Sequence, residues 1–308
     1  MNNPVISVGP DVAAAKDAGR PVVALESTIF SELGLPHPSN REALDRVLAT
    51  LGRGGAVPAL TAVLDGTAHV GVDPAAHELI CGPARKVAAR DLGPAMAQGW
   101  SYGATTVSAS VTLSAAAGVE VFSTGGIGGV HQGWADTGDI SADLPALARH
   151  QVITVTAGAK VFLDLPATLE YLETASVPVI GWACDELPAF HAPTSGLGLT
   201  LRADTAAEVA TLARHHWALG GGGIVVAVPV PTADGIPLDE LQDLVARALA
   251  DTRAAEVSGA AVTPAVLERM AVLSDGRTVA ANLALADNNA SVAAGIATAL
   301  SELPATVR

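Results

Sequence analysis

The sequence contains very little lysine. Of its 17 basic residues only three are lysines, namely Lys16, Lys86 and Lys160. Arginine keeps its proton in proteins and cannot attack a carbonyl carbon, whereas lysine can do so once burial or a nearby cation lowers its pKa. Lys16 lies in a polar, alanine-rich segment, which favours an ordinary surface charge. Lys160 lies in an apolar segment, where a reactive amine and a plain charge are both reasonable interpretations.

Aromatic residues and cysteines are also scarce, at 3% of the chain and two residues respectively. Half of the residues are hydrophobic, so small aliphatic side chains must fill the core, which suits a sheet covered by helices on both faces. Cys81 and Cys184 show no metal-ligand spacing and indicate ordinary reduced residues. Because the N-terminus also lacks a signal-peptide pattern, we expect a cytoplasmic protein.

Positive charge is scarce as well, since 31 acidic residues give a formal net charge of −14. This balance argues against nucleic acid or an anionic membrane surface as a partner. A small anionic ligand is still compatible, because local donors can bind phosphate inside an acidic protein. Long hydrophobic runs are missing too: residues 103–118 carry six Ser and Thr residues and are too polar to span a bilayer.

Short apolar, β-branched runs alternate with helical patterns along most of the chain. Together with one hairpin at Asp65-Gly66, this predicts an α/β fold, a three-layer α/β/α sandwich with a mixed, mostly parallel sheet. No repeat and no linker rich in Pro, Gly or Ser interrupts residues 1–308, so we expect a single domain. The expected strands are 21–26, 59–64, 68–72, 120–123, 152–156, 177–182, 199–202 and 224–228, and the expected helices are 41–51, 165–174, 206–219, 238–250, 264–273 and 291–300.

Two of these strands end in residues that can carry chemistry. Glu26 ends an apolar strand, where a carboxyl group tends to have a raised pKa and suits a general acid; a glutamate at the solvent edge is the plainer alternative. Lys160 follows the strand 152–156 through Ala157-Gly-Ala, at the end of a strand where α/β enzymes place their chemistry. We expect the chain to turn helical directly after Lys160.

Two further segments predict sites for an anion. Residues 102–108 indicate the opening of a small-residue helix, where Thr105, Thr106, Ser108 and free N–H groups can bind an anion. Simple capping of a tightly packed helix is the alternative, and these residues alone favour it slightly. Residues 123–131 contain four glycines within five positions after a strand, which lets the backbone approach a ligand. Their spacing is not the dinucleotide-binding pattern. The glycines at 220–223 predict a tight turn.

Polar clusters appear twice more. Asp136, Asp139 and Asp143 lie within eight residues, and carboxylates without a histidine pair suit hydrated Mg²⁺ or Mn²⁺. Asp143 also fits a helix N-cap, whereas Asp139 does not. The triplet 287–289 falls between two helical patterns, where capping of the final helix and a functional role are both open.

Several of these segments resemble, in the same order, the pseudouridine-5′-phosphate glycosidase family, also called indigoidine synthase A-like. The resemblance covers nearly the whole chain, from about residue 21 to Asn289. It rests on Ala24-Leu-Glu-Ser-Thr-Ile, Gly103-Ala-Thr-Thr-Val, Thr124-Gly-Gly-Ile-Gly-Gly-Val-His131, Asp139-Ile-Ser-Ala-Asp-Leu, Ala157-Gly-Ala-Lys160, Asp164-Leu and Glu170-Tyr-Leu-Glu-Thr.

The resemblance implies a trimeric enzyme with an α/β/α fold that uses a divalent metal, usually Mn²⁺. The family reversibly splits pseudouridine 5′-phosphate into uracil and ribose 5-phosphate. The implied roles are Lys160 as nucleophile, Glu26 as proton donor and Asp139 as metal ligand. The implied substrate contacts are Lys86, Val107, Ser141, Ala142 and Asp143, and His131 and Asn289 match family positions near the ligand. Gln132 departs from the arginine that the family carries after this histidine.

This chemistry agrees with the residues found first. A C-glycosidic bond has no leaving heteroatom to protonate, so an ordinary pair of carboxylates would not suffice. Lys160 can attack C1′, open the ribose ring and form an iminium, and Glu26 can protonate the departing uracil carbon. Lys86 would bind phosphate and lower the pKa of Lys160 by repulsion. The helix start expected after Lys160 would lower that pKa further. The metal would orient waters and substrate.

Two other functions stay open at this point. A Schiff-base aldolase or lyase acting on another sugar phosphate would use the same lysine and phosphate site without recognising uracil. A non-catalytic sugar-phosphate-binding protein would need neither the nucleophile Lys160 nor the acid Glu26. A comparison of substrates separates these possibilities.

Overall fold

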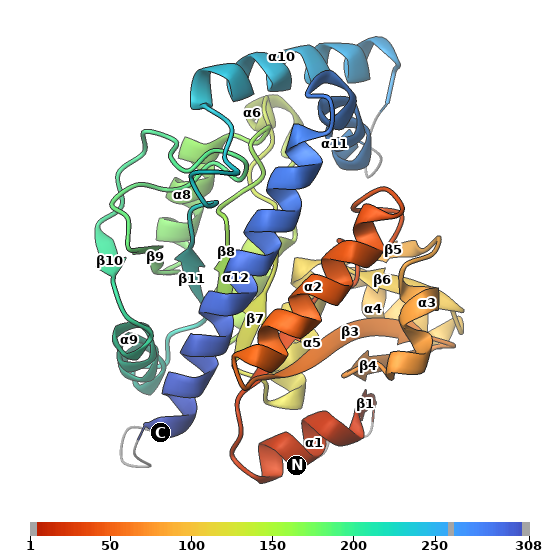
Figure 1. The fold of residues 1–308 in the computed structure, drawn as a ribbon, viewed down its shortest axis with the longest axis vertical. Helices are drawn as coiled ribbons and strands as arrows, with labels where there is room; N and C mark the ends of the chain where they lie inside the picture. The colour runs from red at the N-terminus through yellow and green to blue at the C-terminus, as the bar shows by residue number, and fades with distance from the viewer. Residues whose placement is uncertain (1–4, 258–261, 304–308) are drawn as a thin grey trace.

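The computed structural model describes residues 5–257 and 262–303, which form one mixed sheet with helices on both faces (Figure 1). Within these residues every strand pairing is parallel except those of β3 with β4 and with β6. The predicted α/β fold with a mixed, mostly parallel sheet is thus confirmed. In spatial order the strands are β1 (Ile6–Val8), β4 (Thr67–Val70), β3 (Val57–Leu64), β2 (Val22–Leu25), β7 (Val121–Ser123), β8 (Ile153–Thr156), β11 (Ile224–Ala227), β9 (Val179–Trp182) and β10 (Leu201–Ala203), with β6 (Tyr102–Thr105) on β3 and β5 (Arg85–Val87) on β6.

The sheet is buried on both faces, and β2 shows how the sequence achieves this. Val23 and Leu25 pack into one core cluster, and Val22 and Ala24 pack into a second on the other face. Successive side chains of a strand point to opposite faces, so a strand covered on both sides is a continuous apolar run. On the first face lie α2 (Ser39–Arg53), α9 (Ala206–Ala218) and α12 (Arg277–Glu302); on the second lie α1 (Pro10–Asp17), α4 (Leu92–Ala97), α5 (Val107–Ala117), α7 (Asp143–Arg149) and α8 (Leu165–Thr174). The helices α10 (Leu238–Ala254) and α11 (Val262–Leu273) pack mainly against each other.

The neighbouring strands β2, β7 and β8 run parallel, so their carboxyl ends meet at one edge of the sheet. In Figure 1 this edge faces α10 and the short helix α6 (Trp134–Thr137), and the opposite edge lies toward the chain termini. The helix α12 runs beside α2 across the first face (Figure 1). Of the helices in the described part of the chain, none combines the length and the apolar character that a membrane crossing requires.

Three sequence predictions about elements are wrong. Residues 102–105 form the strand β6 instead of opening a helix, and α5 begins only at Val107. The chain does not turn helical directly after Lys160, because α8 begins at Leu165 with Asp164 as its N-cap. The final helix does not begin near Ser291: α12 is continuous from Arg277 to Glu302 and contains the polar triplet 287–289 in its interior.

Candidate active site

Glu26 lies at the carboxyl end of β2 and is buried, with 7% of its surface exposed. The Thr124 hydroxyl, just after β7, donates a hydrogen bond to Oε1 of Glu26. Burial raises the pKa of Glu26 from 4.5 to about 7, with a smaller increase from Asp143, while Lys160, the Thr124 hydrogen bond and Lys86 act in the opposite direction. A carboxyl group with such a pKa can hold or release a proton near neutral pH.

Two lysines, Lys160 and Lys86, lie near Glu26. Lys160 follows β8, is partly buried and lies close enough to lower the pKa of Glu26. Lys86 lies on the strand β5, opposite Ala104 of β6. Although part of its side chain is exposed, partial burial lowers the pKa of Lys86, and repulsion from Lys160 lowers it further. Three of the predicted residues, distant in sequence, therefore share one electrostatic environment.

Backbone hydrogen bonds join the glycine loop after β7 to the segment that carries Lys160. The N–H of Ala157 donates to the Gly125 carbonyl (2.9 Å), that of Ile127 donates to Gly158 (3.1 Å), and that of Lys160 donates to Ile127 (3.1 Å). These bonds extend the β7–β8 pairing beyond the strands. They fix the backbone of Lys160 relative to the loop whose Thr124 contacts Glu26.

Close packing explains why this loop is rich in glycine. A Cβ atom on Gly128 would lie 2.2 Å from Oγ of Ser141 and 2.8 Å from Oδ2 of Asp143, and one on Gly126 would lie 2.7 Å from the Phe190 ring. All three distances are below normal contact, so a side chain at either position would displace the loop or its neighbours. The glycines thus let the loop lie directly against the residues 141–143.

Asp143 links this loop to α5. Its two carboxylate oxygens accept hydrogen bonds from the N–H groups of Ser108 and Gly128, both at 2.8 Å, and the residue is buried. The alternative that Asp143 is the N-cap of its own helix is wrong, because Ala142 is at that position. Ser141 Oγ accepts from the Asp143 N–H (3.2 Å), so the segment 141–143 is held from both sides.

The predicted anion site at the start of α5 is only partly available. Val107 is the first residue of the helix and Thr106 is its N-cap, but Asp143 already takes the Ser108 N–H. Thr105 is fully buried, and its hydroxyl donates to the Thr61 carbonyl (2.8 Å), so it serves the core. Contacts of Thr105, Thr106 and Val107 with substrate therefore stay predictions.

The predicted metal ligand Asp139 lies on an exposed loop beside His131, with 3.8 Å between Oδ2 and Nδ1. Within residues 5–257 and 262–303, the His, Cys, Asp and Glu side chains form no group of three or more that could hold a metal ion. One exposed carboxylate and one imidazole do not make a closed zinc-type cage, but they fit a cation such as Mg²⁺ or Mn²⁺ that keeps most of its waters. Gln132 donates to the Leu163 carbonyl (3.1 Å), which ties this loop to the Lys160 segment.

The triplet 287–289 connects α12 to three different elements. Asp287 accepts a hydrogen bond from the Thr50 hydroxyl of α2, and Asn288 donates to the Pro229 carbonyl (3.1 Å) after β11. Asn289 is fully buried, and its amide donates to the carbonyls of Thr124 (2.8 Å) and Gly125 (3.4 Å). Capping of the final helix, one of the two interpretations left open, is therefore wrong.

Thr124 was not identified as a site residue from the sequence. Its only signal in the sequence is its position between a predicted strand and the glycines.

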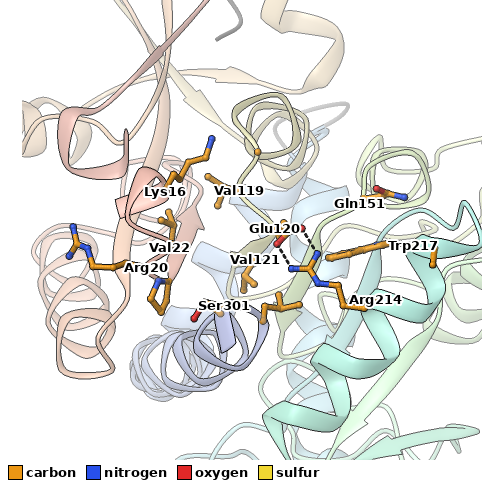
Figure 2. Close-up of a pocket in the computed structure, with 16 residues that line it drawn as sticks. Lys16, Arg20, Val22, Val119, Glu120, Val121, Gln151, Arg214, Trp217 and Ser301 are labelled. Atoms are coloured by element: carbon orange, nitrogen blue, oxygen red, sulfur yellow. Dashed lines mark hydrogen bonds and ion pairs between the residues drawn. The ribbon is translucent and has the colours of Figure 1, made fainter. Parts of the chain in front are cut away.

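A separate cavity of about 700 Å³ opens at the opposite edge of the sheet, where β2 and β7 begin (Figure 2). Its lining includes Lys16, whose ammonium donates to the Ala117 carbonyl at the end of α5, and an ion pair in which Arg214 donates to Glu120 (2.5 and 2.8 Å). Glu26, Lys86 and Lys160 are not part of this lining. Lys16 is thus remote from the acid and the other two lysines, and it stabilises a helix end.

The fold and the site define an α/β protein with a buried acid and an amine at the carboxyl edge of its sheet. Residues 11–299 match the model of the family described as Indigoidine synthase A like protein, and the chain belongs to this family.

Relatives named pseudouridine-5′-phosphate glycosidase include those of Methylobacterium nodulans (49% identical over 97% of this chain and 89% of the relative) and Herpetosiphon aurantiacus (48%, over 95% and 97%). Two solved structures share the fold. The prealnumycin C-glycosynthase in complex with ribulose 5-phosphate has a TM-score of 0.89 at 34% identity, covering 97% of this chain and 98% of the other. The indigoidine synthase A-like protein of Thermotoga maritima has a TM-score of 0.86 at 32% identity, covering 98% and 99%.

Proposed function

We propose that the protein is a pseudouridine-5′-phosphate glycosidase, which reversibly converts pseudouridine 5′-phosphate and water into uracil and ribose 5-phosphate. Close relatives over nearly the full length carry this name. The ribulose 5-phosphate in the C-glycosynthase supports a pentose phosphate as the ligand class. The observation that carries the proposal is that Glu26, Lys160 and Lys86, far apart in the sequence, lie close enough to influence one another's charge.

The reaction needs an amine because carbon is a poor leaving group. The amine of Lys160 attacks C1′, a C–N bond forms, and the C1′–O4′ bond breaks as O4′ takes up the proton that the nitrogen loses. The nitrogen lone pair then forms the C1′ iminium while the C1′–C5 bond breaks. The electron pair of the C1′–C5 bond passes to the uracil ring. Glu26 gives its proton to uracil C5. Water then hydrolyses the iminium, which releases ribose 5-phosphate, restores the amine and returns one proton to Glu26.

The environment of Glu26 suits this step. A carboxyl group with its usual pKa is almost fully ionised at pH 7, but burial keeps a large fraction of Glu26 protonated there. The Thr124 hydroxyl orients the carboxyl group, which lies within the electrostatic reach of Lys160. Glu26 is therefore already protonated before the carbon–carbon bond breaks.

The remaining residues of the site would bind the substrate. Lys86 faces the phosphate together with the first N–H of α5 at Val107 and the Thr106 hydroxyl, since cations and helix N-termini both attract anions. Ser141, which packs against Gly128 of the glycine loop, and its neighbour Ala142 would also contact the substrate. Asp139, assisted by His131, would hold a hydrated Mn²⁺ or Mg²⁺, which supplies positive charge and oriented waters near the substrate when bound.

Borohydride trapping tests the proposal. The protein is incubated with ribose 5-phosphate, reduced, digested and mapped by mass spectrometry; we expect the adduct on Lys160, with Lys16 as an internal control. Lys160→Arg keeps the charge and should abolish both trapping and uracil release, whereas Lys16→Arg should change neither. Appreciable activity of Lys160→Arg would remove Lys160 as nucleophile. A Lys160 adduct without uracil release from pseudouridine 5′-phosphate would instead favour an aldolase or lyase.

We also propose a homotrimer, as the family resemblance implies. Light scattering coupled to size-exclusion chromatography measures this directly, because a trimer of the 30.8 kDa chain has three times that mass. A monomeric mass would refute the assembly without affecting the chemistry proposed for Lys160.

A further inference from the structure

Glu26 is held by a chain of contacts that begins on the last helix. The Thr124 hydroxyl donates to its carboxylate, and the Thr124 carbonyl accepts from the buried amide of Asn289. Thr124 is itself 4% exposed, and its N–H donates to the Val155 carbonyl of β8 (3.0 Å). Main chain and side chain of Thr124 are thus both engaged, so the direction of its hydroxyl is fixed.

Asn289 also acts on the next peptide. Its second, longer hydrogen bond goes to the Gly125 carbonyl (3.4 Å), which also accepts the Ala157 N–H (2.9 Å). That peptide begins the glycine loop and connects it to the segment of Lys160. A glycine loop has little stiffness of its own, because glycine has the widest choice of backbone angles. The amide of Asn289 supplies a restraint that the loop sequence lacks.

We propose that Asn289 is a positioning residue for the acid Glu26 and acts on it through Thr124. The inference deepens the function proposed above and rests on Glu26 being the proton donor. This role requires no direct contact of Asn289 with Glu26 or with the substrate. Asn289 determines the direction of the Thr124 hydroxyl by holding the Thr124 carbonyl. The neighbouring Asn288 provides a matched comparison, since it comes from the same helix but bonds to the Pro229 carbonyl instead.

The contacts of Asn289 argue against a purely packing role. The side chain is fully buried, yet its Oδ1 has no hydrogen-bond partner among the described residues. An unpaired buried carbonyl oxygen is costly, and an apolar residue of similar size would avoid that cost. The amide therefore contributes through its two donor bonds, both to the loop that contacts Glu26.

The consequence for Glu26 has a definite sign. The Thr124 hydrogen bond favours the ionised carboxylate, as Lys160 and Lys86 do, while Asp143 and burial favour the protonated form. Loss of the hydroxyl therefore raises the pKa of Glu26 further. In the cleavage direction the acid must be protonated, so the alkaline limb of the kcat/KM profile moves to higher pH while the maximal rate falls, because the acid is no longer aimed.

The test compares Thr124→Val, Thr124→Ser, Asn289→Leu and Asn288→Leu in pH–rate profiles of uracil release. We expect Thr124→Val and Asn289→Leu to lower kcat by about tenfold or more and to move the alkaline limb upward, with Thr124→Ser and Asn288→Leu close to wild type. The double variant Thr124→Val/Asn289→Leu should lose little more than Thr124→Val alone, because both act through one hydrogen bond. Additive losses, or an unchanged limb in Asn289→Leu, overturn the proposal.

A second readout keeps this inference separate from the proposed reaction. Titration of the ¹³C-labelled Glu26 carboxyl by NMR, assigned with Glu26→Gln, needs no substrate. Even if the wild type released no uracil, Asn289→Leu should raise the pKa of Glu26 in the same direction as Thr124→Val. An unchanged pKa in a folded Asn289→Leu protein overturns the positioning role whatever the enzyme's substrate.

Discussion

The buried acid Glu26 should make the stability of the protein fall as the pH rises. Its pKa is 4.5 when exposed and about 7 in the folded state, so the unfolded chain gives up its proton first. Folding then favours the protonated form, and stability present below pH 4.5 is lost progressively as the pH rises to about 7. This change of pKa corresponds to about 3 kcal/mol, since each pKa unit is worth about 1.4 kcal/mol.

The variant Glu26→Gln isolates this effect, because glutamine keeps the shape and cannot ionise. Urea unfolding followed by tryptophan fluorescence, at several pH values and one protein concentration, gives the free energy of unfolding. We expect Glu26→Gln to gain about 3 kcal/mol on wild type between pH 4.5 and pH 8. The matched control is Glu78→Gln, whose side chain is 91% exposed and should give a curve parallel to wild type. Parallel curves for Glu26→Gln and wild type would refute the reasoning.

Three further outcomes follow from the packing and the charges. Gly128→Ala should destabilise the protein by about 1–3 kcal/mol and lower uracil release, because its Cβ would lie 2.2 Å from the Ser141 hydroxyl; a wild-type melting curve would contradict this. Gly52→Ala, in α2 with nothing within 4 Å of its new Cβ, should instead stabilise by about 0.4–1 kcal/mol in the same melting experiment. Asp139→Asn should raise the Mn²⁺ concentration needed for half-maximal activity about tenfold or more, and an unchanged Mn²⁺ titration would remove Asp139 as the ligand.

The elements that the sequence predicted well are those whose signal is local. The apolar run of β2 and the helix Leu165–Thr174 have their own periodicity, and both have the expected place. The strand β6 was missed because Gly103 and Ala104 have little β propensity. Gly103 is required there by its neighbours: a Cβ would lie 2.5 Å from the Val87 side chain of β5, which no local pattern reveals.

The site divides in the same way. Glu26 and Lys160 each follow a predicted strand, and the carboxyl ends of parallel strands meet at one edge of the sheet. Their closeness could therefore be predicted from the sequence. The partners of Asp143 are 35 and 15 residues away in the sequence, so its bonds to Ser108 and Gly128 follow only from tertiary structure. Mid-helix polar residues such as Asn289 look misplaced until the elements that they contact are known.

The dependence of the glycine loop on α12 also affects the order in which the protein can be completed. Asn289 and its partner Thr124 are 165 residues apart, and at about 5–20 residues per second a ribosome needs roughly 8–30 s to make the chain between them. For most of that interval, from residue 160 onward, the nascent chain contains both Glu26 and Lys160, but Asn289 has not yet been synthesised. The arrangement of Thr124 beside Glu26 is therefore among the last features that the growing chain acquires.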